Sequence, residues 1–406
     1  MDAPSRTLLS ICIMKFDTLK NNDSFCILPF IHQEKKFNGT FHICCYGDQL
    51  QSDSAADNTS LENFNSQKMQ DIRTAMMQNK RHNSCNFCYQ QEDLGIVSPR
   101  MRENDSWMKW KDTHKAITVC LENFDQKKLM RPISYDLRYS NTCTLKCRMC
   151  NSSSSSSINA EYKKLNQIWP EKFWVIDNLR INHDVEFHND VQKIYLAGGE
   201  PLVEPLNLEL LNQAANYNDE LVILINTSLN IVNAKFYEVL QKFKFLTLVV
   251  SIDGTDKVND YIRHGSNFEE IKRNLGKFSK NDKMFSTCVS IYNIFNLRSL
   301  IKFIQNEYPQ HAHNHSINIV NDIEELFIEN IPYKLRPAII NELNQILHEA
   351  DDLPSVGIKN CITILEKNNF NEKRFRNFIK YTKILDESRQ ESIKEVVPQL
   401  AEYFDE

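Results

Sequence analysis

The sequence predicts an α/β protein with six strands in a parallel sheet or barrel, a small cysteine-rich module before it and a helical extension after it. Three observations support this fold class. From about residue 133, short apolar segments alternate with amphipathic ones, as in consecutive βα units. Most of the 12 cysteines precede residue 151. Beyond about residue 333 the pattern becomes helical and charged, and 406 residues suffice for two or three domains.

Composition and charge exclude several classes of partner. Charged residues make up 25% of the chain, and the net charge is −5. This balance points to neither nucleic acid nor an anionic membrane surface. The longest apolar run, Phe245–Ile252, is typical of a buried strand and too short to cross a bilayer. Thr7–Phe16 is a poor signal peptide because Lys15 interrupts it and no small-residue cleavage site follows. We therefore expect a cytoplasmic protein that contacts neither a membrane nor nucleic acid.

The first part of the chain lacks long periodic runs. We expect a cysteine-rich module at 1–105, held by metal rather than by a large core, and then a linker with some helix at 106–132. Asn-Gly between apolar segments predicts a hairpin. The expected elements of the module are a hairpin at Phe37–Cys44, a polar loop at Gln51–Ser60 and a short helix near Phe64–Gln78.

The alternating region forms the next unit, at 133–325, and the helical extension occupies 326–406. The predicted strands are Ile133–Tyr139, Lys193–Ala197, Leu221–Asn226, Phe245–Ile252, Phe285–Tyr292 and Ser316–Val320. The predicted helices between them lie near 158–168, 205–217, 232–243, 267–278 and 297–307.

Three cysteines follow the first predicted strand directly: Cys143, Cys147 and Cys150. Three thiolates in a tight loop can bind three irons of a 4Fe–4S cubane and leave the fourth iron open. The alternative is a zinc knuckle that takes a fourth ligand from elsewhere in the chain. On either interpretation the loop is a metal centre.

The second predicted strand ends in Gly198, Gly199, Glu200 and Pro201. Two glycines expose the backbone, and the glutamate presents an acceptor at the end of the strand. This arrangement suits an ammonium group lying against the main chain. Taken by itself, the same string also fits an ordinary turn.

Together, the cysteine loop and the Gly-Gly-Glu-Pro segment resemble the radical S-adenosylmethionine (SAM) superfamily. The resemblance implies a partial six-stranded (β/α) barrel with a 4Fe–4S cluster on the three cysteines. It implies that the open iron binds the amine and carboxylate of SAM, with Gly198, Gly199 and Glu200 at the amine. Reductive cleavage of SAM would give a 5′-deoxyadenosyl radical that abstracts hydrogen from a substrate. A reduced flavodoxin- or ferredoxin-type protein would supply the electron. Met149 stands where many members carry an aromatic residue.

Polar residues also follow the later strands, at the end where barrel active sites lie. Ser251 and Asp253 resemble family residues that bind the ribose and the methionine end of SAM. For Asp253 the alternative is a turn residue before glycine. Arg263 is a candidate partner for the methionine carboxylate, or else a solvated arginine. Asn226 is a further candidate contact, although asparagine is common in turns.

A second group of cysteines lies in the first module: Cys26, Cys44, Cys45, Cys85 and Cys88. Cys85 and Cys88 form a chelating pair, and two more thiolates would complete a second iron–sulfur cluster or a zinc site. The stretch at 23–105 resembles the auxiliary-cluster modules called SPASM and twitch domains, here placed before the barrel. Neighbouring strand residues point to opposite faces, so only one of the adjacent pair should reach a cluster, and we favour Cys44.

The resemblance makes a peptide or protein the expected substrate. A small molecule such as a sugar or nucleotide is the alternative for an enzyme, and a non-catalytic zinc-binding interaction module is the alternative outside enzymes. The remaining cysteines are interpreted as small buried apolar residues, and the three alternating histidines as a polar loop. These residues are Cys12, Cys120, Cys288 and Cys361, and His311, His313 and His315.

Overall fold

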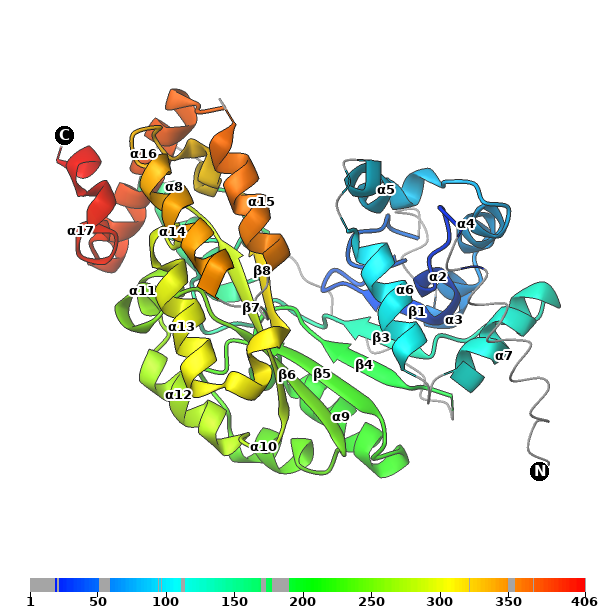
Figure 1. Ribbon diagram of the computed structural model, residues 1–406. Helices are drawn as coiled ribbons and strands as arrows, with labels where there is room; N and C mark the ends of the chain where they lie inside the picture. The colour runs from blue at the N-terminus through cyan, green and yellow to red at the C-terminus, as the bar shows by residue number, and fades with distance from the viewer. Residues whose placement is uncertain are drawn as a thin grey trace.

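An eight-stranded sheet organises the protein (Figure 1). The computed structural model describes residues 19, 22–50, 59–93, 95, 97–110, 114–168, 173–176, 190–320, 322–349, 355–367 and 369–405. The strand order is β2-β1-β3-β4-β5-β6-β7-β8, and all neighbours are parallel except β1 and β2. The strands are β1 His32–Lys35, β2 Phe41–His42, β3 Ser134–Leu137, β4 Lys193–Leu196, β5 Val222–Thr227, β6 Phe245–Ser251, β7 Asp282–Val289 and β8 His315–Ile319.

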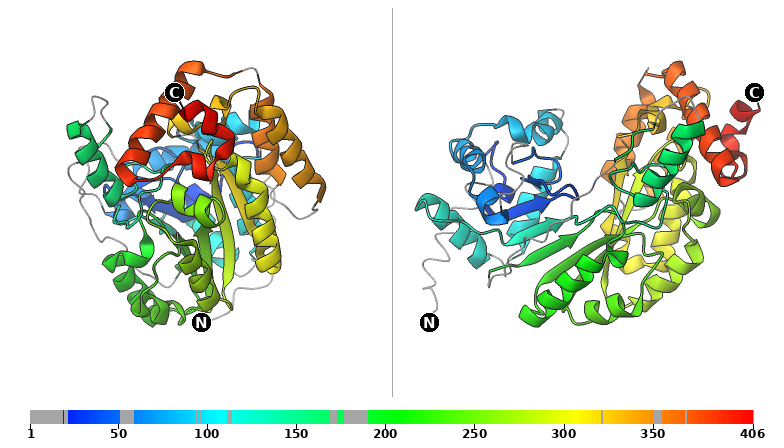
Figure 2. Two further views of the ribbon diagram at one scale, coloured as in Figure 1. Left: turned by 90° about the vertical axis from the view of Figure 1, so that its left-hand side faces the viewer. Right: turned by 180° about the vertical axis from the view of Figure 1, so that it is seen from behind.

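The six predicted strands are present as β3 to β8, with ends within about three residues of the predicted ones. Between them lie the helices α8 Ser156–Ile168, α9 Pro205–Tyr217, α10 Ala234–Leu240, α11 Asp256–Ile262, α12 Phe268–Lys277 and α13 Leu297–Glu307. The prediction missed α11. Helices α9 to α13 cover one face of the sheet (Figures 1 and 2). Apolar side chains of α9, α10, α12 and α13 and alternate strand residues such as Leu248 and Val250 form one core.

The opposite side of strands β4 to β7 is more exposed, and we call it the open face. Its residues alternate with the buried ones and are half-buried or exposed. Parallel strands place such residues in rows across the sheet. The polar members of the open face are Lys193, Tyr195, Asn226, Thr247, Ser251, Asp282, Ser286 and Cys288.

The N-terminal module is joined to this sheet, which the sequence analysis did not predict. The hairpin is confirmed, but its strands are β1 and β2, with Gly39 at φ +82° between them. β1 also pairs in parallel with β3, so that His32 lies beside Ser134. The sheet therefore has two strands beyond the predicted six.

The same module has an apolar core of its own, so the prediction that metal replaces a large core was wrong. Phe25, Phe64, Met69 and Trp107 are among its buried residues. The helix predicted near 64–78 is present as α4, and α3 precedes it. Of the polar loop predicted at 51–60, residues 51–58 lie outside the described residues. The helices are α2 Leu28–Ile31, α3 Ser60–Phe64, α4 Gln67–Met77, α5 Asn86–Asp93, α6 Pro99–Lys109 and α7 His114–Asp125.

The C-terminal part is helical, as predicted, and packs against the sheet instead of extending from it. Phe378 and Ile358 share a core with Val289 of β7. A Cβ on Gly357 would lie 2.5 Å from the Ile317 carbonyl oxygen, so this helix touches β8 directly. The helices are α14 Arg336–Glu349, α15 Ser355–Glu366, α16 Glu372–Arg389 and α17 Ile393–Val396.

Short 3₁₀ turns complete the described secondary structure: η2 Asn83–Cys85, η4 Pro201–Val203, η5 Ile294–Asn296, η6 Pro309–Asn314, η7 Glu324–Leu326, η8 Ile328–Asn330 and η9 Pro398–Phe404. The region predicted as a polar histidine loop is η6 and the start of β8, and His311 and His315 are buried in it. No described helix is both long and apolar enough to cross a membrane.

Candidate active site

The three cysteines predicted to bind a cluster lie in the loop that leaves β3. We call residues 143–150 the cysteine loop. Its backbone is held in an antiparallel pattern, because Lys146 N donates to His264 O at 2.9 Å and Arg148 N donates to Ile262 O at 2.7 Å. This pattern sets Cys147 opposite Arg263. The loop is therefore fixed against the turn that follows α11.

The three thiols have different surroundings. Cys147 is 5% exposed, while Cys143 and Cys150 are half-buried. A hydrogen bond from Cys150 lowers the pKa of Cys147, and the charge of Arg263, whose Nη1 lies 4.0 Å from Cys147 Sγ, lowers it further. Burial raises the pKa of Cys143 to about 12. The loop thus already favours one thiolate, the form that binds iron.

Gly198 and Gly199 lie against the backbone of the segment that leads into the cysteine loop. Gly198 has φ +114°, and a Cβ on Gly199 would lie 2.2 Å from the Thr142 carbonyl oxygen. Gly199 N donates to Ser140 O at 3.1 Å, and Glu200 N donates to Thr142 O at 2.7 Å. From the sequence, these two glycines are expected to let a ligand approach the backbone. The approach of the chain itself already requires them.

The Glu200 carboxylate is buried and its acceptor capacity is full. Oε1 accepts from Thr227 Oγ1 at 2.6 Å and from Leu202 N at 3.2 Å. Oε2 accepts from Ser228 N at 2.9 Å and from Ser228 Oγ at 2.6 Å. Each carboxylate oxygen has two lone pairs, so an ammonium group would have to replace one of these donors. Glu200 joins the end of β4 to the turn after β5.

Asp253 and Arg263 form a buried ion pair beside Cys147. Arg263 Nε lies 2.6 Å from Asp253 Oδ2, and Cys288 N donates to Asp253 Oδ1 at 2.7 Å. Burial raises the pKa of Asp253, and the charge of Arg263 opposes this effect. Asn293 Nδ2 also donates to the Asp253 carbonyl oxygen at 2.9 Å. Cys288, interpreted from sequence as an isolated buried residue, thus lies next to the site. Its alternation with Ser286 on β7 was the available signal.

The other two predicted SAM contacts lie together on the open face. Ser251 Oγ donates to Asn226 Oδ1 at 2.8 Å, and both side chains are half-buried. Ser251 is also in register with Ser286 of β7. The intermediate burial of Asn226 and Ser251 leaves part of each side chain accessible to a bound molecule.

In the N-terminal module, four cysteines influence one another. Burial is the largest of the causes that raise the pKa of Cys26, and the thiols of Cys85 and Cys88 raise it further. Burial and the adjacent Cys45 raise the pKa of Cys44, with smaller contributions from Cys26 and Cys85, and burial and Cys88 raise the pKa of Cys85. We call Cys26, Cys44, Cys85 and Cys88 the cysteine quartet.

Cys45 has other neighbours. Burial, Asp136 and Glu34 together raise its pKa to about 12. Asp136 and Glu34 both lie on strands of the sheet, and both contact Arg138 in ion pairs at 2.9 and 3.1 Å. The adjacent thiols of Cys44 and Cys45 therefore have different surroundings, although both lie in the turn after β2 and not in a strand.

Hydrogen bonds of Arg100 connect two of the segments that carry the cysteine quartet. Arg100 Nη2 donates to Glu92 Oε2 at 2.6 Å, and its Nη1 donates to the Phe25 carbonyl oxygen at 2.5 Å. Ser98 Oγ also donates to Glu92. These contacts join the segments that carry Cys26 and Cys88.

The donor set of the cysteine loop fits a cubane cluster better than a single ion. Among the described residues, no three His, Cys, Asp or Glu side chains are placed around one metal ion. A structural zinc ion needs four ligands that converge on it. Each thiolate of a cubane binds a different iron. The three thiols of one loop therefore need only face the same cluster and do not have to converge on one ion.

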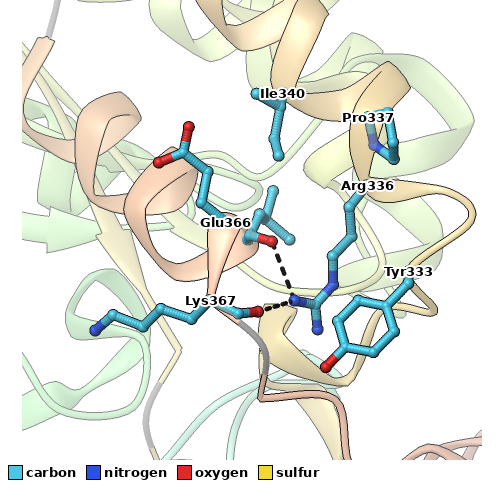
Figure 3. A pocket seen from close by; sticks show the side chains of 7 residues that line it. Tyr333, Arg336, Pro337, Ile340, Glu366 and Lys367 are labelled. Atoms are coloured by element: carbon cyan, nitrogen blue, oxygen red, sulfur yellow. Dashed lines mark hydrogen bonds between the residues drawn. The ribbon is translucent and has the colours of Figure 1, made fainter.

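A cavity of about 310 Å³ lies elsewhere, on the C-terminal helices (Figure 3). Arg336 reaches across it and donates through Nη1 to the carbonyl oxygens of Leu365 and Lys367 at 3.0 and 2.7 Å. The guanidinium thereby caps the end of α15. The cavity contains no cysteine and is distinct from the candidate site.

Comparison with known families gives one match. The sequence profile of the Radical SAM superfamily matches residues 137–302, which include the cysteine loop, Glu200, Asp253 and Arg263. No curated protein matches the chain. Residues 137–302 therefore match the Radical SAM superfamily.

Solved structures show weaker similarity. The chain is 15% identical to anSMEcpe with bound AdoMet, over 53% of this chain and 61% of that one, with a TM-score of 0.37. It is 13% identical to Streptococcus suis SuiB bound to precursor peptide SuiA, over 85% and 75%, with a TM-score of 0.38. It is 15% identical to TYW1 with a lysine-pyruvate adduct bound, over 50% and 70%, with a TM-score of 0.29. The chain thus spans about three fifths of the length of anSMEcpe. These TM-scores are too low to assign a substrate.

Proposed function

We propose that this protein is a radical SAM enzyme that abstracts hydrogen from a peptide or protein substrate. Cys143, Cys147 and Cys150 hold a 4Fe–4S cluster in this proposal. The observation that carries it is the placement of these thiols in one loop, fixed against Gly199 on one side and Arg263 on the other, within the matched domain. When bound, the cluster supplies the electron that cleaves SAM to a 5′-deoxyadenosyl radical.

The chain's own residues prepare this site. Arg263 places positive charge beside Cys147 and favours the thiolate form. Asp253 holds Arg263 in place through the buried ion pair. Glu200 keeps the Gly-Gly segment and the turn after β5 together, so the amine of SAM would meet main-chain carbonyl oxygens there or displace one of the carboxylate's donors.

The open face is the proposed place for SAM and substrate. Asn226 and Ser251 offer an amide and a hydroxyl to the ribose and methionine end of SAM. Their half-burial leaves these groups within reach of a ligand. A peptide or protein substrate follows from the resemblance of the N-terminal module to auxiliary-cluster domains, and a sugar or nucleotide is the alternative substrate class.

We further propose that the cysteine quartet holds an auxiliary iron–sulfur cluster. The support is the mutual influence of Cys26, Cys44 and Cys85. A second cluster in the N-terminal module would accept or pass on an electron. A flavodoxin- or ferredoxin-type protein would act as the electron donor of the enzyme.

Anaerobic turnover tests the proposal. The protein is reconstituted with iron and sulfide, reduced with dithionite and given SAM without substrate. We expect 5′-deoxyadenosine from the wild type and none from Cys147→Ala. A colourless protein that contains zinc and gives no 5′-deoxyadenosine with any reductant would overturn the proposal in favour of a zinc-binding interaction module.

A further inference from the structure

The residue between Cys147 and Met149 is tied to the far end of the chain. Arg148 is fully buried, and its Nη2 donates to Asp386 Oδ1 at 2.6 Å and to Glu391 Oε2 at 2.7 Å. Asp386 lies in α16, and Glu391 follows that helix. These contacts join positions more than 230 residues apart, and they bind the cysteine loop to the C-terminal helices.

The aromatic surroundings of Arg148 restrict its position further. Its guanidinium lies 3.7 Å from the centre of the Tyr261 ring and 5.5 Å from that of Tyr292. Tyr261 O–H donates to Asp386 Oδ1 at 2.8 Å, so the ring and the carboxylate are linked as well. A guanidinium between rings and carboxylates has little freedom, because its planar fork and its stacking both fix the orientation.

The carboxylates are themselves held in place. Asp386 Oδ2 accepts from Ile393 N at 2.8 Å, and Glu391 Oε1 lies 2.7 Å from His264 Nδ1. Gln390, between them, has the left-handed conformation with φ +55° that ends α16. The chain thus turns sharply after α16 and brings Glu391 to the same turn, at His264, that pairs with the cysteine loop.

Helix α16 also contacts the backbone of the cysteine loop. Tyr381 O–H donates to the Arg148 carbonyl oxygen at 3.0 Å, and Tyr381 and Cys150 both pack against an apolar cluster that includes Tyr162 of α8. Arg389, at the end of α16, donates twice to Glu161 of α8, at 3.1 and 2.7 Å. Helices α8 and α16 therefore form one support on the outer side of the loop.

We propose that Arg148 is a positioning residue, through which the end of α16 holds the cysteine loop in the conformation that receives a metal cluster. The inference rests on the proposed function of that loop and assigns a role to the C-terminal extension. The loop has no helix or strand of its own, so its order must come from such contacts. Holding three ligands in place beforehand lowers the entropic cost of binding.

Amide hydrogen exchange of the cluster-free protein tests the inference directly. The variants are Glu391→Gln, which keeps the shape of the side chain, and Arg148→Met, which removes the charge. Arg376→Gln is the matched control, since Arg376 forms an exposed ion pair with Glu372 at 3.3 Å in the same helix. In both test variants we expect amides of residues 143–150 to exchange about tenfold faster, which corresponds to about 1.4 kcal/mol of local opening free energy.

Amide exchange away from the cysteine loop should stay constant. Exchange in β5 and β6 should match the wild type, and Arg376→Gln should match it everywhere. After reconstitution with limiting iron and sulfide, we expect Glu391→Gln to retain less iron on the loop and to change the low-temperature electron paramagnetic resonance signal of the reduced cluster. Unchanged exchange at 143–150 in both test variants would overturn the inference. A failure of the wild type to make 5′-deoxyadenosine would instead overturn the proposed function and leave the exchange result standing.

Discussion

The cysteine loop and the cysteine quartet place their thiols in different electrostatic surroundings. In the loop, Cys150 and Arg263 lower the pKa of Cys147. In the quartet, burial and neighbouring thiols raise the pKa of Cys26 and Cys44, and Arg100 offsets only a small part of this effect. The other two loop thiols resemble those of the quartet, because burial raises the pKa of Cys143 to about 12 and the hydrogen bond to Cys147 raises that of Cys150. Both sets of thiols must lose protons as a metal enters, and the metal affinity of the quartet should rise more steeply with pH because none of its thiols has a lowered pKa.

The two regions also differ in what holds them together. Within the quartet, the residues that fix the chain belong to the same module, as Arg100 and Glu92 do. The cysteine loop depends on Asp386 and Glu391, which belong to the far end of the sequence. A local module with its own apolar core can keep its fold without metal, whereas the loop relies on the packing of the whole chain.

The largest expected effect separates the two regions by function. Cys150→Ala should abolish cleavage of SAM to 5′-deoxyadenosine, because the catalytic cluster loses a ligand. Cys85→Ala should still cleave SAM in the absence of substrate while binding less iron. Chromatographic detection of 5′-deoxyadenosine, with iron analysis of the same samples, makes the comparison, and Cys120→Ala serves as a buried-thiol control. Loss of SAM cleavage in Cys85→Ala would contradict the division of roles.

A stability effect tests whether the framework under the loop is as rigid as its contacts suggest. Glu200→Ala leaves the buried donors of Thr227 and Ser228 without an acceptor, which should cost about 4 kcal/mol of unfolding free energy. Denaturant unfolding measures this cost. The exposed Glu220, paired with Lys244 at 3.2 Å, gives a control at which alanine should change stability by less than about 0.5 kcal/mol. Equal effects at both sites would contradict a special role for Glu200.

The junction between the two regions predicts a pH effect. Burial raises the pKa of Glu34 from 4.5 to about 7, although Arg138 opposes this, while Asp136 and Lys36 contribute less. His42 lies opposite on β2, and burial keeps it neutral by lowering its pKa to about 4. Between pH 4.5 and 7 the unfolded carboxyl is ionised while the folded one keeps its proton, so folding loses stability as the pH rises through this range.

Glu34→Gln removes this loss, because glutamine does not ionise. The variant should be more stable than the wild type at pH 8 by roughly 3 kcal/mol at most, and about equal to it at pH 5. Unfolding by urea at the two pH values provides the measurement. A constant difference between the proteins at both pH values would show that Glu34 is not the titrating group.

The smallest expected effect concerns the adjacent thiols. Cys45→Ser should keep the iron content of the wild type, because Cys45 faces Asp136 and Glu34 rather than the quartet. Cys44→Ser should lower the iron content, because it removes a member of the quartet. Iron and sulfide analysis after reconstitution distinguishes them, and the opposite order would reassign the ligand to Cys45.

Sequence patterns predicted the six parallel strands because each carries an apolar run between turns. They missed β1, whose residues His32–Lys35 are all polar. Partners elsewhere in the chain compensate for the burial of these polar groups, since Gln33 is hydrogen-bonded to Ser60 and Glu34 is paired with Arg138. A pattern of apolar residues cannot reveal such compensation.

The site stays a prediction, and the sequence supplied its candidate thiols for a related reason. Cys143, Cys147 and Cys150 lie close together in sequence, so their spacing alone marked them as candidate ligands. The full acceptor capacity of Glu200 and the support of Arg148 by Asp386 depend on contacts that only the folded chain creates. The sequence shows residue types that can bind a ligand, while the partners that occupy them become visible in three dimensions.

The parallel pairing of β1 with β3 has a practical consequence for anyone who shortens the chain. Deleting the residues before about 133, the boundary that the sequence suggests, would remove β1 and uncover the backbone groups of β3 that now pair with His32 to Lys35. An uncovered edge of a parallel sheet is a template for pairing with another chain. The sheet expressed without its N-terminal module should therefore aggregate, and the smallest manageable fragment of this protein has to begin before His32.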